Sequence, residues 1–186
     1  MNKKVKIVSI VASVFILMFV IISILNTNLK YHKYFYITKL DMNEQYNTEW
    51  GVVSVTGMKV YNRNDFINEY PGVESYILDT DKEIGYMVIY VTFDVTDVDK
   101  YDAEWFKMWS IEADNGWRNG KSMYINAYLN NGVKITENGR YELCCEYNMN
   151  VGNMSLKTFD ELYKIKYRVM INQNPIVYYK LEGEYI

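Results

Sequence analysis

An uncharged run of 23 residues near the start of the chain limits the structures that this sequence can adopt. Its core, IVSIVASVFILMFVIISIL, holds 19 aliphatic, aromatic and small side chains. As a helix that rises about 1.5 Å per residue, this core spans roughly 28 Å, close to the hydrocarbon thickness of a bilayer. A signal peptide has a shorter apolar region of about 7–15 residues and a small-residue cleavage site, which the exit SILNTNLK lacks. We therefore expect residues 7–29 to form an uncleaved transmembrane anchor.

The lysines on either side of the predicted anchor bear on its orientation. Three precede it and three follow it: Lys3, Lys4 and Lys6, then Lys30, Lys33 and Lys39. The count is balanced, but the leading tail, residues 1–6, is short and carries only basic charge, and such tails normally stay in the cytoplasm. We expect a single-pass protein of the cell membrane, with its N-terminus inside and its C-terminal part extracytoplasmic. The predicted partner of the anchor is membrane lipid.

The aromatic stretch YHKYFY, residues 31–36, follows the anchor. It fits an interfacial belt, in which amphipathic rings lie at the level of the lipid headgroups, and it also fits the first strand of the folded part. Either interpretation gives a juxtamembrane linker at residues 30–47. Residues 48–186 then suffice for one domain with a real core. Hydrophobic residues make up 49% of the chain and the net charge is −3, which indicates a globular domain and no nucleic-acid partner.

Apolar residues alternate along several segments of this domain. In YMVIYVTFDV, every second residue from Met87 to Val95 is apolar and shares one face, while Tyr86 and Tyr90 fall on the other. This period of two predicts a long strand with one buried face. The segment YKIKYRVMIN repeats the pattern, and the turn QNP joins it to IVYYKLE as a hairpin. Further strands are predicted at about 50–61, 105–113 and 140–147.

Turn-forming residues separate these segments. Asn-Gly pairs and neighbouring Asp or Asn residues recur at short intervals and tolerate the positive φ of tight turns. The pattern predicts a mainly all-β domain, an antiparallel β-sandwich with one or two short helices. The two helical segments are NDFINEY, which begins with a capping Asn64 and stops at Pro71, and SLKTFDELY, with Ser155 as its candidate cap.

The stretch ELCCEY contains both cysteines of the chain, side by side. A structural zinc site needs four ligands and the redox spacing C-x-x-C is absent, so neither kind of site is predicted. A vicinal disulfide would distort the strand. Because adjacent residues of a strand face opposite ways, Cys145 is expected to point into the core and Cys144 outward, where it could meet a partner outside the cell.

Catalytic signatures are missing from the sequence. The one histidine, His32, lies beside the predicted anchor, where an interfacial position is expected rather than a Ser-His-Asp or Cys-His arrangement. The four aspartates of FDVTDVDKYD alternate as calcium ligands can, but the glycine and closing glutamate of an EF-hand are missing, so a solvated loop is expected. A carboxylate pair of the glycosidase kind has no positive support. We predict no catalytic, cofactor-binding or metal-binding residue and no cofactor.

Three tryptophans, Trp105, Trp109 and Trp117, lie close together in the sequence. On the predicted strand Trp105 and Trp109 share a face, which favours packing in the core of the sandwich. Exposed tryptophans would instead offer a platform for a carbohydrate or a peptide. The outward Tyr86 and Tyr90 leave a similar choice open, because either another element covers them or they form an adhesive face.

The layout resembles a group of small membrane-anchored proteins of Gram-positive bacteria with a telokin-like, immunoglobulin-like domain. The features that carry the resemblance are the strand GYMVIYVTFDVTD, the turn NGWRNG, the passage LNNG to ENGRYEL and the hairpin KYRVMINQNPIVYYKLE, within residues 50–182. The resemblance implies an extracytoplasmic immunoglobulin-like sandwich tethered to the membrane. It brings no activity and no functional residues with it, and the adjacent cysteines depart from it.

The expected function follows from location rather than from a recognised site. We expect a non-enzymatic binding or interaction module for an unknown protein or cell-envelope ligand, because sandwiches of this kind work through loops or an exposed sheet face. One alternative is a subunit of a membrane or secretion assembly, for which Ser9 and Ser13 offer a small-residue contact in the anchor. A less favoured alternative is a carboxylate-dependent hydrolase of the cell envelope.

Overall fold

The structure is a computed structural model that describes residues 14–27, 37–77, 83–150 and 158–186. The chain divides into two compact units, Met1–Ile37 and Thr38–Ile186. In the first unit, residues 14–27 form a helix whose side chains are all exposed. This helix lies within the predicted anchor at 7–29, and the remaining residues of that anchor lie outside the described ranges. No helix among the described residues is long and apolar enough to cross a membrane.

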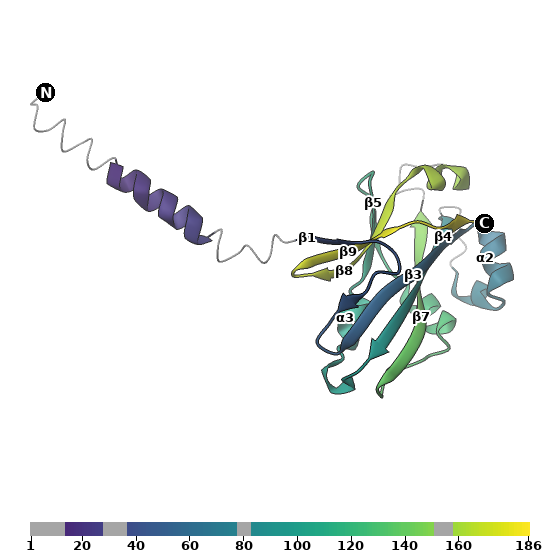
Figure 1. Cartoon of the computed structure of the whole chain (residues 1–186). Helices are drawn as coiled ribbons and strands as arrows, with labels where there is room; N and C mark the ends of the chain where they lie inside the picture. The colour runs from purple at the N-terminus through teal and green to yellow at the C-terminus, as the bar shows by residue number, and fades with distance from the viewer. Residues whose placement is uncertain (1–13, 28–36, 78–82, 151–157) are drawn as a thin grey trace, which may run out of the picture. The chain divides into compact units, whose positions relative to one another are not determined.

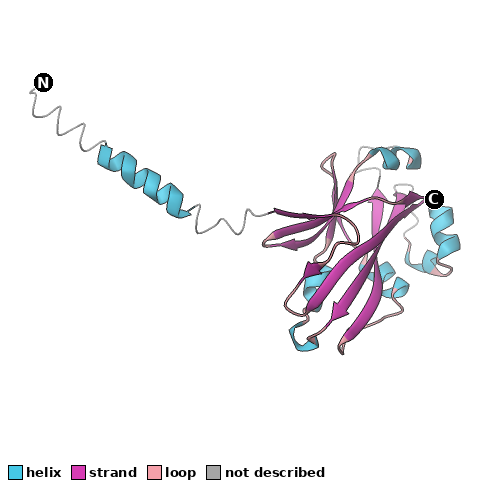
Figure 2. Cartoon of the chain, in the orientation of Figure 1, coloured by secondary structure: helices cyan, strands magenta, loops and turns pink. Residues whose placement is uncertain are grey.

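The second unit is a β-sandwich of two five-stranded sheets (Figures 1 and 2). Sheet A has the strand order β1 (Ile37–Leu40), β9 (Ile176–Leu181), β8 (Tyr167–Gln173), β5 (Ser110–Ala113) and β6 (Arg118–Gly120). Sheet B has the order β10 (Glu184–Tyr185), β3 (Gly51–Tyr61), β4 (Glu83–Val95) and β7 (Gly139–Asn150), with β2 (Tyr46–Asn47) paired to β3. This architecture confirms the predicted mainly β sandwich and the predicted strands at 50–61 and 140–147.

The main core lies between the two sheets, as the alternation of apolar residues predicted. Met87, Ile89 and Phe93 of β4 point into it and are fully buried. At one end of this core the aromatic rings cluster around Phe93, whose ring centroid lies 4.9 Å from that of Phe106 and 5.9 Å from that of Trp109. The Phe93–Phe106 pair is edge-to-face and the Phe93–Trp109 pair is tilted, and such aromatic pairs add to the stabilisation that burial provides. The aromatic side chains therefore pack in the core rather than forming a surface platform.

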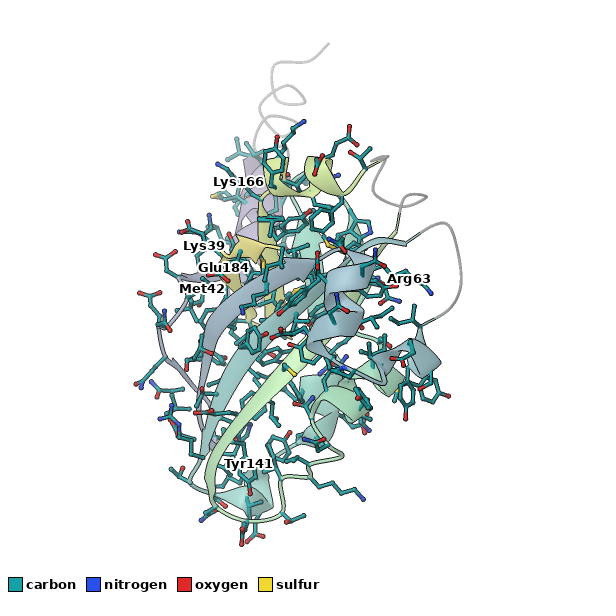
Figure 3. The ribbon with its side chains drawn as sticks, turned by 90° about the vertical axis from the view of Figure 1, so that its right-hand side faces the viewer. Lys39, Met42, Arg63, Tyr141, Lys166 and Glu184 are labelled. Atoms are coloured by element: carbon teal, nitrogen blue, oxygen red, sulfur yellow. The ribbon has the colours of Figure 1, made fainter. Side chains whose placement is uncertain are left out.

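A layer of short helices covers the outer face of sheet B, and Figure 3 shows it from the side of α2. The layer consists of α2 (Arg63–Glu69), η1 (Val73–Tyr76) and α4 (Met123–Leu129). Phe66 of α2 stacks on Tyr86 of β4, with ring centroids 4.5 Å apart. The Tyr90 hydroxyl lies 2.9 Å from that of Tyr70. The choice left open for Tyr86 and Tyr90 is thus decided, because a second small core covers both.

Several predictions about single elements were wrong. The domain has more helices than the one or two predicted. Helix α2 and the 3-10 helix η3 (Phe159–Lys164) lie in the two predicted segments, whereas η1, η2 (Val98–Lys100), α3 (Ala103–Lys107) and α4 were not predicted. The strand predicted at 105–113 is α3 followed by β5. Asp102 starts α3, because its side chain accepts a hydrogen bond of 2.9 Å from the Glu104 amide. Trp105 consequently lies on a helix and not on a strand face shared with Trp109.

The C-terminal third also departs from the simple alternation. The strand predicted at 163–172 begins only at Tyr167, because η3 occupies the residues before it. A register shift between Met170 and Asn172 interrupts its period of two. The last strand, β10, pairs with β3 in parallel, so sheet B is not wholly antiparallel. Gly183 permits this approach, because a Cβ there would collide with the Met58 carbonyl oxygen.

The start of α2 was misplaced by two residues. Its capping side chain belongs to Asn62, whose Oδ1 accepts a hydrogen bond of 3.0 Å from the Asp65 amide, rather than to Asn64. The second candidate cap, Ser155, lies outside the described residues. The hairpin β8–β9 with its turn at 173–175 is confirmed.

Candidate functional site

A cavity of about 710 Å³ lies between the segment that carries η2 and α3 and the segment that carries α4 and the loop after it. Apolar groups line most of it, among them Phe106 on one side and Ala127, Val133 and Ile135 on the other. Three lysines also line it: Lys107, Lys121 and Lys134. We call it the lysine-lined cavity.

Lys121 is the lysine of this cavity that contacts Cys145 of the main core. Its Nζ lies 3.2 Å from the centroid of the Phe106 ring, a cation–π contact, and 4.0 Å from Cys145 Sγ. No oxygen atom of the described residues accepts a hydrogen bond from this ammonium, and none of their carboxylates pairs with it. Burial in these surroundings lowers the pKa of Lys121.

Local hydrogen bonds explain why Lys121 lies where it does. Lys121 stands between β6 and the Ser122 that caps α4 by accepting a hydrogen bond of 3.4 Å from the Ile125 amide. The Ser122 amide in turn donates to the Glu146 carbonyl oxygen on β7, at 3.2 Å. These two bonds fix the short connection against sheet B, and the Lys121 side chain is thereby directed between Phe106 and Cys145.

The charge of the cavity lining is one-sided. The chain as a whole has 23 acidic and 20 basic residues, yet no Asp or Glu is among the described residues that line the cavity. Lys107 is paired at the surface with Glu104, at 2.6 Å. Within the described ranges, neither Lys121 nor Lys134 has an ion-pair partner. The cavity thus combines apolar walls with positive charge on Lys121 and Lys134 that no described residue neutralises.

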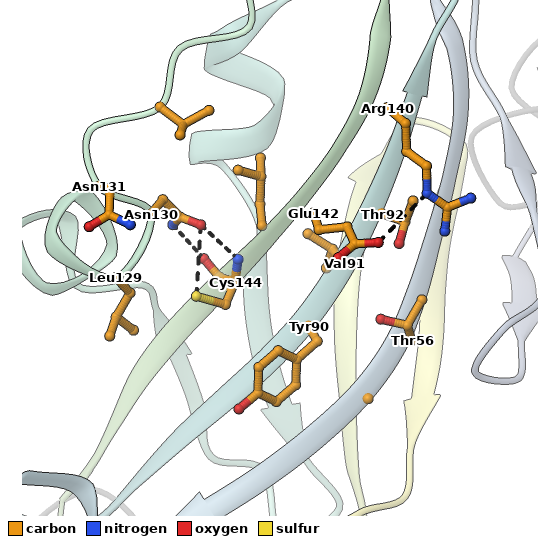
Figure 4. A pocket seen from close by; sticks show the side chains of 13 residues that line it. Thr56, Tyr90, Val91, Thr92, Leu129, Asn130, Asn131, Arg140, Glu142 and Cys144 are labelled. Carbon is orange, nitrogen blue, oxygen red and sulfur yellow. Dashed lines mark hydrogen bonds and ion pairs between the residues drawn. The ribbon is translucent and has the colours of Figure 1, made fainter. Parts of the chain in front are cut away.

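Asn126 of α4 and Asn130, the residue that caps its C-terminal end, close the edge of sheet B beside the cavity. β7 is an edge strand, and unpaired backbone groups at an edge invite association unless they are covered. Asn130 accepts from the Cys144 amide at 2.8 Å and donates to the Cys144 carbonyl oxygen at 2.9 Å (Figure 4). Asn126 makes the corresponding pair with Glu146, at 2.8 and 3.2 Å. The side chains take the place of a neighbouring strand and fix α4 on β7.

The two cysteines face opposite sides of β7, as predicted, but both are buried. Cys145 points into the main core, which confirms its predicted direction. The prediction of an accessible Cys144 was wrong, because α4 covers the outer face and leaves Cys144 only 9% exposed. Burial raises the pKa of the Cys144 thiol to about 12 and that of the Cys145 thiol to about 11. Both thiols are free and protonated at neutral pH.

A second hollow, of about 620 Å³, lies on the outer face of sheet B between β3 and the end of α4 (Figure 4). Its lining is more polar and includes Thr56, Thr92 and Tyr90. Arg140 and Glu142 form an ion pair of 3.7 Å across its rim. The charges in this hollow are balanced within the protein, so the lysine-lined cavity is the stronger candidate for a ligand site.

The residues singled out from the sequence do not gather into a catalytic or metal site within the described ranges. Asp97 pairs with Lys100 at 2.8 Å, which lowers its pKa, and Asp102 caps α3. The other two aspartates of that stretch are Asp94 and Asp99. No group of three or more His, Cys, Asp or Glu in the described part of the chain is placed to hold a metal ion. His32 lies outside the described residues.

Sequence reasoning missed the residues that form the lysine-lined cavity. Phe106, Lys121 and Cys145 meet only in three dimensions, and nothing in NGKSMYIN marks Lys121 as different from the other lysines. The capping Ser122 was the one available signal, because it starts a helix directly after this lysine.

Comparisons with known proteins add little to this description. No protein-family model matches the chain, and no curated protein is significantly similar to it. Among solved structures, it is similar to an uncharacterized beta-sandwich protein from Clostridium difficile 630, with 12% sequence identity and a TM-score of 0.48. That match covers 80% of this chain and 96% of the other. A likeness at this level supports no conclusion about function.

Proposed function

We propose that this chain is a membrane-anchored protein whose extracytoplasmic sandwich is a non-enzymatic binding module, with the lysine-lined cavity as its ligand site. The observation that supports the binding role is the cavity itself. A volume of about 710 Å³ falls in the range of about 300–1,000 Å³ of small-molecule sites. Such sites have mainly apolar walls and a few polar groups that fix the orientation of the ligand, and the lysine-lined cavity has this composition.

The chemistry of the lining favours binding over catalysis. Among the described residues, its titratable side chains are three lysines and Tyr101, and burial raises the pKa of Tyr101 to about 12. A hydrolase that depends on carboxylates needs an acid and a base within reach of one bond, and none of the described residues that line this cavity has a carboxylate. The alternative of a carboxylate-dependent hydrolase therefore gains no support at this site.

The membrane location rests on the apolar sequence of residues 7–29 and on the basic tail before it. Because both native cysteines are buried, they cannot report on topology, and an introduced cysteine is needed. Tyr124 on α4 is 78% exposed. We expect the variant Tyr124→Cys to react in intact cells with a maleimide that does not cross membranes, and the unmodified chain to remain unlabelled. If Tyr124→Cys is labelled only after the membrane has been opened, the domain lies in the cytoplasm and the proposed orientation is wrong.

Filling the cavity should abolish ligand binding. Ala127 lies on α4 with an exposed side chain that lines the cavity, so Ala127→Trp places an indole in the space without entering the core. A small-molecule library is screened by thermal shift on the full chain in nanodiscs, where a ligand at 100 times its Kd adds about 2.7 kcal/mol. We expect compounds that stabilise the original chain but not the filled variant. Matched responses of the two proteins to every compound would refute the proposed site.

A further inference from the structure

We infer that the lysine-lined cavity binds an anionic amphiphile, a single apolar chain that ends in a carboxylate, and that Lys121 contacts the carboxylate. This inference rests on the proposed function and adds the chemical class of the ligand. Three properties of the cavity carry it: the sign of its charge, the position of Lys121 and the apolar side chains at its rim.

The sign of the charge selects an anion. The described residues that line the cavity include three lysines and no carboxylate, in a chain whose net charge is −3. Lys107 has its own partner in Glu104, which leaves the charges of Lys121 and Lys134 uncompensated by any described residue. Potentials of opposite sign between ligand and site guide recognition and disfavour the wrong partner. The two uncompensated lysines therefore disfavour a cationic ligand.

The position of Lys121 places the anionic group. Taking an ammonium out of water is costly unless it is paired and hydrogen-bonded. The Phe106 ring, 3.2 Å from Nζ, compensates for part of this loss, and Cys145 Sγ at 4.0 Å is a weak acceptor. The lowered pKa of Lys121 agrees with incomplete compensation. A carboxylate within reach of Nζ would supply the missing charge-assisted hydrogen bond.

The walls and rim of the cavity fit an apolar chain. Met123 and Val133 line it and are 71% and 52% exposed, respectively, although both are large hydrophobic side chains. Ile135 and Ala127 continue the apolar surface from α4 to the loop after it. Covering this surface with a hydrocarbon chain would stabilise the complex in proportion to the apolar area removed from water. A single chain suits the volume of about 710 Å³, so we assign a free amphiphile rather than the headgroup of a bilayer lipid.

Three ten-carbon probes that differ only in the terminal group test this inference. Decanoate, decanol and decylamine are titrated calorimetrically into the full chain in nanodiscs of neutral lipid, and empty nanodiscs correct for partition into the bilayer. Because a hydrogen bond to a charged group is worth about 1.5–3 kcal/mol, we expect decanoate to bind at least about tenfold tighter than decanol. Decylamine is expected to bind more weakly than either.

Variants at Lys121 separate charge from packing. Lys121→Met keeps an unbranched stem and should remove the preference for decanoate over decanol, while Lys121→Arg keeps the charge and should retain the preference. Lys180→Met is the control, because it makes the same change of net charge on β9 of sheet A at a lysine that is 57% exposed and paired with Asp41. Thermal melting checks that each variant is folded.

The outcomes distinguish the inference from the function on which it rests. Equal affinity for decanoate and decanol, or a preference that survives Lys121→Met, would overturn the anionic ligand and leave the cavity as a binding site. Decanoate binding that is unchanged in Ala127→Trp would overturn both the anionic ligand and the cavity as a binding site. Loss of decanoate binding when the nanodiscs contain anionic phospholipid would identify a lipid headgroup as the occupant and overturn the assignment of a free amphiphile.

Discussion

Replacing Phe93 by alanine is expected to lower the free energy of unfolding by about 3–5 kcal/mol, the usual cost of removing a buried aromatic ring. Phe93 is fully buried in the main core. Its ring contacts those of Trp50, Phe106 and Trp109, with centroids 5.4, 4.9 and 5.9 Å away. The change removes this packing and leaves a cavity that the surrounding rings cannot fill without moving.

Thermal unfolding followed by tryptophan fluorescence measures this effect. A domain of this size loses roughly 2–4 °C in Tm for each kcal/mol, so a loss of about 3–5 kcal/mol in Phe93→Ala should lower Tm by about 6–20 °C. Tyr163→Ala is the control, because Tyr163 is 58% exposed on η3 and should shift stability by less than about 0.5 kcal/mol. Similar shifts for the two variants would show that Phe93 is not at the centre of the aromatic core.

Replacing Asn130 by alanine should lower the free energy of unfolding by about 2–4 kcal/mol and expose the Cys144 thiol to reagents. The substitution leaves both the amide and the carbonyl oxygen of Cys144 without their partner, and an unsatisfied buried polar group costs about 1–3 kcal/mol. In the unmodified chain Cys144 reacts slowly, because it is covered and because its pKa of about 12 keeps the thiol protonated at pH 8. Loosening α4 from β7 admits water, which brings this pKa back toward its ordinary value.

Mass spectrometry after timed reaction with iodoacetamide at pH 8 reads both parts of this prediction. The modified peptide reports Cys144 separately from Cys145 if fragmentation resolves the two sites, and thermal melting reports stability. Tyr124→Ala serves as the control on the same helix, because Tyr124 is 78% exposed. If Cys144 is labelled as fast in the unmodified chain as after Asn130→Ala, then α4 does not cover β7 as described.

The strands could be predicted from the sequence where burial alone decides the pattern. β3, β4 and β7 place alternate side chains on the face of sheet B that packs on the main core, so a period of two follows, apart from the register shift between Val55 and Gly57 of β3. The strand predicted around Trp105 and Trp109 was wrong because the apolar residues of this segment fit both a helix and a strand, while the cap at Asp102 favours the helix. Register shifts such as that at Met170 depend on tertiary packing, which local patterns do not contain.

The candidate site could not be predicted, because its parts are distant in sequence and ordinary in type. Lys121 becomes distinctive only when β6, α4 and β7 bring it between Phe106 and Cys145. The burial of Cys144 could not be predicted from the sequence either. The rule of alternation gave its direction correctly, but whether that face meets water depends on α4, which pairs with β7 through Asn126 and Asn130. Coverage of a sheet face is a tertiary property that alternation does not reveal.

The most direct test of the lysine-lined cavity as a ligand site is a titration of the methyl-labelled full chain with decanoate, followed by NMR. We predict that the methyl resonances of Ala127, Val133 and Ile135 shift together, with one affinity, as the cavity fills. The methyl groups of Val177, buried on β9 of sheet A, should remain unchanged. If the resonances of the cavity residues do not shift, or if those of Val177 shift equally, the lysine-lined cavity is not the ligand site.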